Sequence, residues 1–390
     1  MRESEKPRIH SLDGLRCVAI LAVLLYHYFS RWTPPRHYET LYPYGSVFAP
    51  FFRYGFYGVE LFFVVSGFVI TLTLYRCATP AEFAVRRLAR LWPPMALCCL
   101  ITLCLVRLIP NHTFYAPATG LLPSLTFMDP HLLNLAFKTH LEWIDDAYWS
   151  LFVEVRFYAL AACVFFLGRD RFLRMIYHAA RIVLALSLLC ALLHWESVNR
   201  ILELLFVSKH LPWFLMGIGF FFFLERSSRD ALTLAVLGVA IISLLARAAL
   251  DRSSDFALAA TVIPVIFAAS FRVPVAARLL SCRIVAGLGV ASYSLYLLHQ
   301  NLGTAIIGWL GKVTGLAGPK SAVLAVVTAI LVAAVARVVY VLWEAPSNRF
   351  IVNWYTGRVR RTAALKRNCA ESEREADGVS RSIGSSSTAT

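Results

Sequence analysis

Charged residues are scarce in this chain of 390 residues, of which only 16% are Asp, Glu, Lys or Arg. A soluble enzyme carries about a quarter charged residues and about half apolar ones, whereas this sequence is 58% hydrophobic. Acidic residues are the scarcer kind, 23 against 38 Lys and Arg. The composition therefore excludes a soluble enzyme and a disordered or fibrous chain.

The nine cysteines form no Cys-x-x-Cys pair. Such pairs indicate a zinc or redox site, and a dense set of cysteines in a short secreted chain indicates a disulfide framework. We therefore expect reduced thiols, no disulfide framework and no metal site.

Apolar segments of membrane-spanning length recur from one end of the chain to the other. A helix needs about 20 mostly apolar residues to cross a bilayer. Ten segments meet this criterion: 12–30, 55–75, 91–110, 147–167, 182–195, 204–224, 231–248, 256–271, 284–309 and 321–343. The predicted fold class is an all-α, polytopic integral membrane protein with about ten transmembrane helices.

The basic residues are distributed unevenly between the two sides of these spans. The terminal segments and the loops that follow the second, fourth, sixth and eighth spans hold 24 of the 38 Lys and Arg. The loops that follow the odd-numbered spans hold 10. By the positive-inside rule both termini face the cytoplasm, so the net charge of +15 reflects orientation and no nucleic-acid partner is expected. The expected parts are a cytoplasmic tail over 1–11, a transmembrane domain over 12–348, and a cytoplasmic tail over 349–390, basic and then Ser-rich and disordered.

Ionisable side chains inside spans are costly and are therefore functional candidates. Arg16 and His27 both lie in the first span. Eleven residues make just over three helical turns, so the two side chains share one face about 16 Å apart. The structural alternative is that Arg16 reaches the lipid interface and His27 makes a hydrogen bond within the bundle.

Small and basic residues mark the second and third spans. Ser66 and Gly67 form a small-residue step, which suits either close helix packing or passage of a ligand chain. Arg86, Arg87 and Arg90 cluster at the mouth of the third span. Guanidinium groups bind phosphates bidentately, although an ordinary positive-inside anchor has the same pattern.

Glu154 in the fourth span and His299 in the ninth complete the set of candidates. Counting about 1.5 Å per residue from the ends of the spans places His27, Glu154 and His299 at one level. We therefore expect a titratable layer of these three side chains above a basic site at the inner mouth. The structural alternatives are an ion pair for Glu154 and a core hydrogen bond for His299.

Six motifs stand in order from residue 16 to residue 346. They are Arg16-x10-His27, Phe62-Phe63-x-x-Ser66-Gly67-x-x-x-Thr71, Arg87-x-x-Arg90-Leu91-x-Pro93, Trp149-Ser150-Leu151-x-x-Glu154-x-x-Phe157-Tyr158, Ser292-Tyr293-Ser294-x-Tyr296-Leu297-x-His299 and Tyr340-x-x-x-Glu344-x-Pro346. Together they resemble the acyltransferase-3 family of integral membrane acyltransferases. Glu60 stands where that family favours Asp, which keeps the charge.

The resemblance implies an enzyme that moves an acyl group, most often acetyl, from cytoplasmic acyl-coenzyme A (acyl-CoA) to a hydroxyl of an extracytoplasmic glycan or lipid-linked sugar. It implies a multi-pass protein of a bacterial inner membrane, in contact with membrane lipid. A homo-oligomer, or association with glycan-assembly proteins, is left open.

The resemblance also implies roles for the candidate residues at the two ends of the predicted polar path. At the inner mouth, Arg87 and Arg90 would bind the phosphates of coenzyme A, assisted by Arg86 and Arg16, with the pantetheine arm beside Ser66. At the other end, His27 would act as general base, since its unperturbed pKa of about 6.5 suits proton transfer, or would itself accept the acyl group. Glu154 or His299 would orient His27 or bind acceptor hydroxyls.

Two other classes of protein share part of this pattern. A secondary transporter with an intramembrane His/Glu/Arg relay would more often show inverted repeats and Gly/Pro-broken spans in matching halves, which are not evident here. A non-catalytic partner of a polysaccharide assembly machine would tolerate substitution of His27 and Arg16.

Overall fold

The computed structural model describes residues 10–110, 114–359 and 361–362, and no β-strand occurs among them. The long helices are α1 (His10–Phe29), α3 (Gly58–Arg76), α4 (Pro80–Leu108), α7 (Trp149–Leu167), α8 (Phe172–Leu192), α11 (Ala231–Leu250), α12 (Ser254–Arg272) and α17 (Ala322–Val339). The shorter ones are α2 (Ala49–Phe52), α5 (Leu121–Thr126), α6 (Pro130–Phe137), α9 (Glu196–Phe206), α10 (Leu211–Phe220), α13 (Pro274–Leu280), α14 (Arg283–Val290), α15 (Ser292–Leu298) and α16 (Asn301–Thr314).

Nine helical stretches within these described ranges are long and apolar enough to cross a bilayer, which confirms the predicted all-α polytopic class. They cover 10–29, 49–76, 80–108, 146–167, 169–192, 196–225, 231–250, 254–272 and 319–359. The segment 284–309, predicted as one span, is instead divided into α14, α15 and α16.

The loop before α7 stabilises the interruption between α15 and α16. The Asp145 carboxylate accepts hydrogen bonds from the backbone N–H groups of Asn301 at 2.8 Å and Ala147 at 2.9 Å. Burial raises the pKa of the Asp145 carboxyl to about 7, although these two donors act in the opposite direction. An interrupted helix is tolerated at membrane depth where other groups satisfy the freed backbone. The loop therefore fixes the position of His299, which lies at the interruption.

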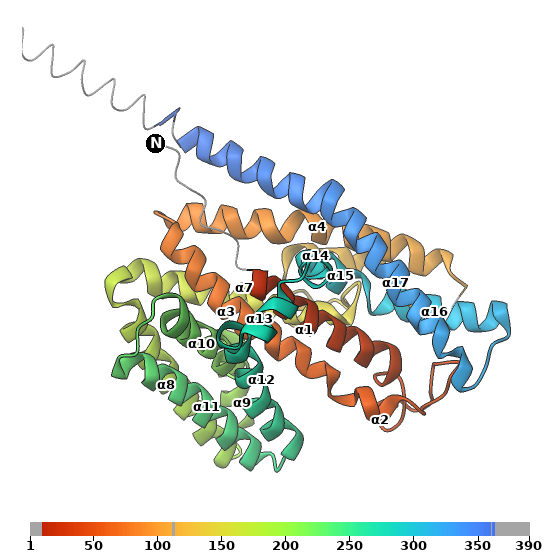
Figure 1. The fold of residues 1–390 in the computed structure, drawn as a ribbon, viewed down its shortest axis with the longest axis horizontal. Coiled ribbons are helices and arrows are strands. Elements are labelled where there is room, and N and C mark those ends of the chain that lie inside the picture. The colour runs from red at the N-terminus through yellow and green to blue at the C-terminus, as the bar shows by residue number, and fades with distance from the viewer. Residues whose placement is uncertain (1–9, 111–113, 360, 363–390) are drawn as a thin grey trace, which may run out of the picture.

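Helices α1 and α3 cross the middle of the molecule (Figure 1). Helices α8, α11 and α12 lie on one side of them, and α4, α16 and α17 lie on the other. Helix α3 also packs closely against α10, because a Cβ on Gly67 would lie 2.1 Å from the carbonyl oxygen of Phe214. Gly217 approaches the carbonyl of Val64 equally closely. These glycines allow the two backbones to touch, as small residues do between membrane helices.

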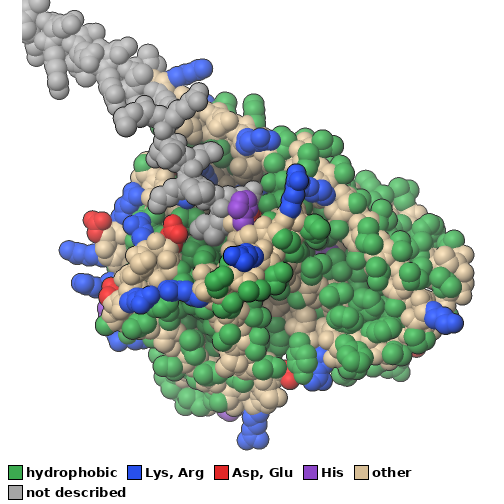
Figure 2. Space-filling view, viewed as in Figure 1, with side chains coloured by type: hydrophobic (Ala, Val, Ile, Leu, Met, Phe, Trp, Pro, Cys, Tyr) green, Lys and Arg blue, Asp and Glu red, His purple; other side chains and the backbone are tan. Residues whose placement is uncertain are grey.

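The peripheral helices present apolar side chains outward. Figure 2 shows a broad hydrophobic surface, with Lys and Arg gathered toward the left of the view. The exposed side chains include Ile182, Leu189, Ile242, Val265 and Ile330. An apolar surface of this extent suits contact with lipid.

The structure describes the two predicted tails only in part. Helix α17 continues through a π-helical turn (Tyr340–Glu344) and onward to residue 359, into the basic part of the predicted C-terminal tail. The predicted disordered Ser-rich part, and most of the predicted tail over 1–11, lie outside the described residues.

Candidate active site

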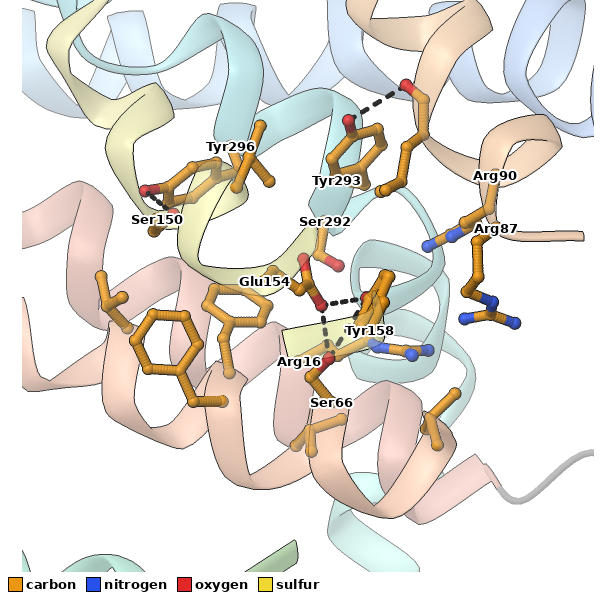
Figure 3. Close-up of a pocket in the computed structure, with 17 residues that line it drawn as sticks. Arg16, Ser66, Arg87, Arg90, Ser150, Glu154, Tyr158, Ser292, Tyr293 and Tyr296 are labelled. Atoms are coloured by element: carbon orange, nitrogen blue, oxygen red, sulfur yellow. Dashed lines mark hydrogen bonds between the residues drawn. The ribbon is translucent and has the colours of Figure 1, made fainter. Parts of the chain in front are cut away.

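A basic cavity of about 90 Å³ lies between α1, α3, α4, α7 and α15. Its polar lining residues are Arg16, Ser66, Arg87, Arg90, Ser150, Glu154, Tyr158, Ser292, Tyr293 and Tyr296. In Figure 3 the three arginines lie at the opposite end of this basic cavity from Tyr296 and Ser150. The structure therefore brings together four of the five predicted donor-binding residues.

Arg87 has unused hydrogen-bonding capacity in the basic cavity. Its Nη2 donates to Thr73 Oγ1 at 3.0 Å. Its Nε is buried and has no hydrogen-bond partner among the residues that the structure describes. A buried guanidinium donor without a partner is costly, and an anion in the cavity would satisfy it.

Arg90 is paired within the protein. Its Nη1 donates to Glu344 Oε1 at 2.5 Å, and Ser294 Oγ donates to Glu344 Oε2 at 2.6 Å. Glu344 is fully buried, so the ion pair fixes the π-helical turn after α17 against α4 and α15. Arg90 thus combines a structural role with its position in the cavity.

Replacing Glu344 with glutamine is expected to destabilise the protein, because Arg90 loses its buried counter-charge. Removing one partner of a buried ion pair costs about 3–5 kcal/mol. The apparent melting temperature of the purified protein should fall by several degrees. Glu82→Gln is the matched control, since Glu82 pairs with Arg86 at 2.8 Å on a more exposed helix face, where such pairs contribute about 0.5 kcal/mol. Equal shifts in the two variants would contradict the structural role of Glu344.

Glu154 lies in the same cavity and organises two hydroxyl groups. Its Oε1 accepts hydrogen bonds from both Ser66 Oγ and Tyr158 Oη (Figure 3), and those two hydroxyls lie 3.2 Å apart. Glu154 and Tyr158 share a face of α7, as four-residue spacing requires. Ser66 comes from α3, and no spacing within the sequence could have paired it with Glu154.

A second cavity of about 300 Å³, called here the histidine cavity, adjoins the basic cavity. Its lining includes Tyr26, His27, Arg31, Arg36, Glu60, Asp146, Ala147, Trp149 and Gln300, and it shares Val59 and Tyr296 with the basic cavity. The first and last turns of neighbouring helices converge here, which gives the histidine cavity both carboxylates and guanidinium groups.

His27 and His299 are in contact beside this cavity. The Nε2 of His299 lies 3.2 Å from the Nδ1 of His27, and their ring centroids are 4.8 Å apart. Each Nδ1 faces a backbone carbonyl, Val23 at 2.9 Å for His27 and Tyr296 at 2.7 Å for His299. Because a carbonyl only accepts, both Nδ1 atoms carry the proton in the neutral pair. The Nε2 of His27 is then the unprotonated nitrogen and can act as a base.

Tyrosines of the loop after α1 hold the end of the helix that carries His27. The hydroxyl of Tyr42 donates to the carbonyl of His27, and that of Tyr44 donates to the carbonyl of Tyr28. The last carbonyls of a helix have no partner within it. These two buried tyrosines therefore fix the position of His27.

Glu60 is a buried carboxylate that lines the histidine cavity from the first turn of α3. Its Oε2 is without a hydrogen-bond partner in the described part of the chain. The N-terminal end of a helix favours negative charge. Glu60 thus contributes a carboxyl group with an unused acceptor to the lining of the histidine cavity.

The structure corrects two of the sequence predictions about this region. Glu154 lies in the basic cavity and not beside His27. The first turn of α7 lines the histidine cavity through Trp149, and Glu154 is five residues further along the helix. Arg86 is held by Glu82 and is absent from the described lining of the basic cavity.

Of the two roles that the sequence left open for the Ser66–Gly67 step, Gly67 has the first, because it packs closely against α10. Ser66 alone of that step faces the cavity.

Several residues of the site had no role assigned from the sequence. They are Arg31, Arg36, Glu60, Asp146, Tyr296 and Gln300 around the histidine cavity, and Glu344 beside the basic one. The three- and four-residue steps from Tyr296 to His299 and Gln300 could have placed Tyr296 at the site. Arg36 and Asp146 lie in loops, where periodicity carries no information about position.

Comparison with known proteins matches residues 9–343, most of the chain, to the family model described as "Acyltransferase domain" of the acyltransferase-3 type. The "Putative peptidoglycan O-acetyltransferase YrhL" of Bacillus subtilis (strain 168) is 29% identical over 171 residues, 39% of this chain and 23% of that protein. A "Putative O-acetyltransferase" of Staphylococcus aureus (strain COL) is 33% identical over 91 residues, 22% of this chain and 12% of that protein.

The aligned part of this chain thus spans less than a quarter of the length of either relative. No solved structure matches the chain significantly. The match to the family model covers all the motifs from Arg16 to His299. The chain therefore belongs to the acyltransferase-3 family of membrane acyltransferases.

Proposed function

We propose that the protein transfers an acetyl group from cytoplasmic acetyl-CoA to a hydroxyl of an extracytoplasmic glycan or lipid-linked sugar, in a bacterial inner membrane. One observation carries the proposal: a basic cavity and a cavity with a histidine base adjoin within one helical bundle and share two residues. Family membership and the names of the two relatives support the reaction class.

The basic cavity fits the donor. Its arginines, and the unpartnered Nε of Arg87 above all, offer donors to an anion at its mouth. A cavity of about 90 Å³ suits the thioester end of the donor rather than the whole molecule. The phosphates would therefore lie against Arg87, Arg90 and Arg16, with the thioester pointing toward Tyr296.

The histidine cavity fits a polyhydroxylated acceptor. Glu60 and Asp146 can accept hydrogen bonds from sugar hydroxyls, while Arg31 and Arg36 can donate to ring or carboxylate oxygens. Trp149 adds an aromatic surface to the same lining. A relative is named for peptidoglycan, which makes muramyl glycans the first acceptors to test.

His27 supplies the proton chemistry of the transfer. Its Nε2 removes the proton from the acceptor hydroxyl as the oxygen attacks the thioester carbon. The new C–O bond forms, the C–S bond breaks, and the proton passes from His27 to the departing thiolate. His299 and the Val23 carbonyl hold Nδ1 and so keep the imidazole oriented.

The direct test uses purified protein in lipid nanodiscs with labelled acetyl-CoA and peptidoglycan fragments. An acetyltransferase should transfer the label to the glycan and hydrolyse the donor slowly when no acceptor is present. In proteoliposomes a transporter would instead move its substrate unmodified, and a scaffold would do neither. Either of those outcomes would overturn the proposal.

Replacing Glu154 with glutamine is expected to lower kcat about tenfold without loss of membrane insertion. The carboxylate holds Ser66 and Tyr158 through two charge-assisted hydrogen bonds, and weakening them by about 1.4 kcal/mol in total corresponds to that factor. Turnover at several concentrations of acetyl-CoA separates kcat from KM. Tyr158→Phe removes only one of the two donors and should have a smaller effect. Wild-type kcat in Glu154→Gln would show that the cluster is merely structural.

A further inference from the structure

Two residues, Val59 and Tyr296, line both cavities. On one side of these two residues, Ser66 of α3 and Tyr293 of α15 line the basic cavity. On the other side lie Glu60 and Gln300, which line the histidine cavity. Val59 and Tyr296 therefore form the wall that separates the two cavities.

The side chain of Tyr296 is firmly held in this wall. Its hydroxyl donates to the carbonyl of Ala147 at 2.6 Å and lies 2.8 Å from Ser150 Oγ. Ala147 lines the histidine cavity and Ser150 lines the basic cavity. The ring itself contacts His299, with centroids 5.3 Å apart, and is buried. The aromatic ring is thus anchored at its tip between one residue of each cavity.

We infer that Tyr296 and Val59 form a constriction that restricts the donor to short acyl groups and keeps water of the histidine cavity from the thioester. This inference rests on the proposed function, because it assumes that the thioester lies in the basic cavity and the acceptor beside His27. Tyr296 and Val59 are specificity-determining residues in this account and perform no chemistry.

The size limit follows from where the acyl group must go. Its carbonyl carbon has to meet an oxygen beside His27, so the remainder of the acyl chain must fit at the wall between the cavities. An extra methylene in a tightly fitting apolar site changes a rate by about 10–200-fold. A constriction made of one aromatic ring and one valine should therefore admit acetyl at least tenfold more readily than butyryl.

The test compares two donors, acetyl-CoA and butyryl-CoA, in wild-type protein and in Tyr296→Ala. Wild type should use butyryl-CoA at least tenfold less well. Tyr296→Ala should raise the ratio of butyryl to acetyl turnover about tenfold and should hydrolyse acetyl-CoA faster than wild type in the absence of acceptor. Tyr296→Phe keeps the ring and should keep the wild-type ratio.

Val59→Ala provides a second and milder route to the same result, from a different helix. It should raise the butyryl ratio even if Tyr296→Ala fails to insert. Val65→Ala is the matched control, because it removes the same side-chain volume as Val59→Ala. Val65 lines the basic cavity but not the histidine cavity, so this volume is lost away from the wall. It should leave the butyryl ratio at its wild-type value, which separates a constriction from a general gain in volume.

The possible failures are distinguishable. A wild-type protein that neither transfers nor hydrolyses acetyl groups would overturn the proposed function, and this inference with it. An active wild type with an unchanged butyryl ratio in Val59→Ala and in any folded Tyr296→Ala would overturn this inference alone. An equal rise in Val65→Ala would overturn it as well.

Discussion

Replacing His27 with alanine is expected to lower acetyl transfer by about 10²–10⁴-fold, the usual contribution of a positioned general base. His27 is the one imidazole in the described lining of the histidine cavity. Its Nδ1 is held by the Val23 carbonyl and by His299, which leaves Nε2 as the base. Initial rates with labelled acetyl-CoA and saturating acceptor measure the effect.

Two variants show whether this loss reflects proton transfer. His210→Ala removes an imidazole that contacts Trp149 at a centroid distance of 5.3 Å but lies outside the described lining of both cavities of the site, and we expect nearly wild-type transfer. His299→Ala removes a neighbour of His27 and should cost about tenfold with a shifted pH profile, since a lost hydrogen bond is worth about 1–1.5 kcal/mol. Normal transfer by a correctly inserted His27→Ala protein would refute the assignment.

Replacing Arg87 with alanine is expected to raise the KM for acetyl-CoA about 10–100-fold, because a hydrogen bond to a charged group contributes about 1.5–3 kcal/mol. The value of kcat at saturating donor should change much less, since the proposed function puts Arg87 on the phosphates and not on the reacting carbon. Arg87→Lys keeps the charge but loses the planar pair of donors. It should fall between wild type and alanine.

The adjacent residue supplies the control for Arg87. Arg86 has the same charge and nearly the same depth on α4, but Glu82 holds it outside the described lining of the basic cavity. Arg86→Ala should leave the KM for acetyl-CoA within about twofold of wild type, the scale of a screened surface charge. Equal KM values in the Arg86 and Arg87 variants would mean that the cluster only orients the protein in the membrane.

Relations within one helix could be predicted from the sequence. The eleven-residue step from Arg16 to His27 indicated one face, and these residues do lie at the two ends of the site, one in each cavity. The spacing of Glu154 and Tyr158 was equally informative, because helical periodicity fixes it. Apolar length was enough to identify most of the spans.

Relations between helices could not be predicted in the same way. Glu154 was placed at the level of His27 by counting from helix ends, but α7 begins beside the histidine cavity, so Glu154, five residues after Trp149, lines the basic cavity. The interruption near His299 depends on Asp145, which is 154 residues away along the chain. The partner of Arg90 is similarly remote, at Glu344. Which end of the bundle faces the cytoplasm remains a prediction from the loop charges.

The wall shared by the two cavities has a consequence for the proposed transfer. Four helices, α1, α3, α7 and α15, each contribute residues to both cavities, so the proposed reactants could approach each other within a static frame. At this point Val59 and Tyr296 separate the two cavities. The proposed transfer would then need no carrier cycle, and the thioester bond rather than voltage or an ion gradient would drive it.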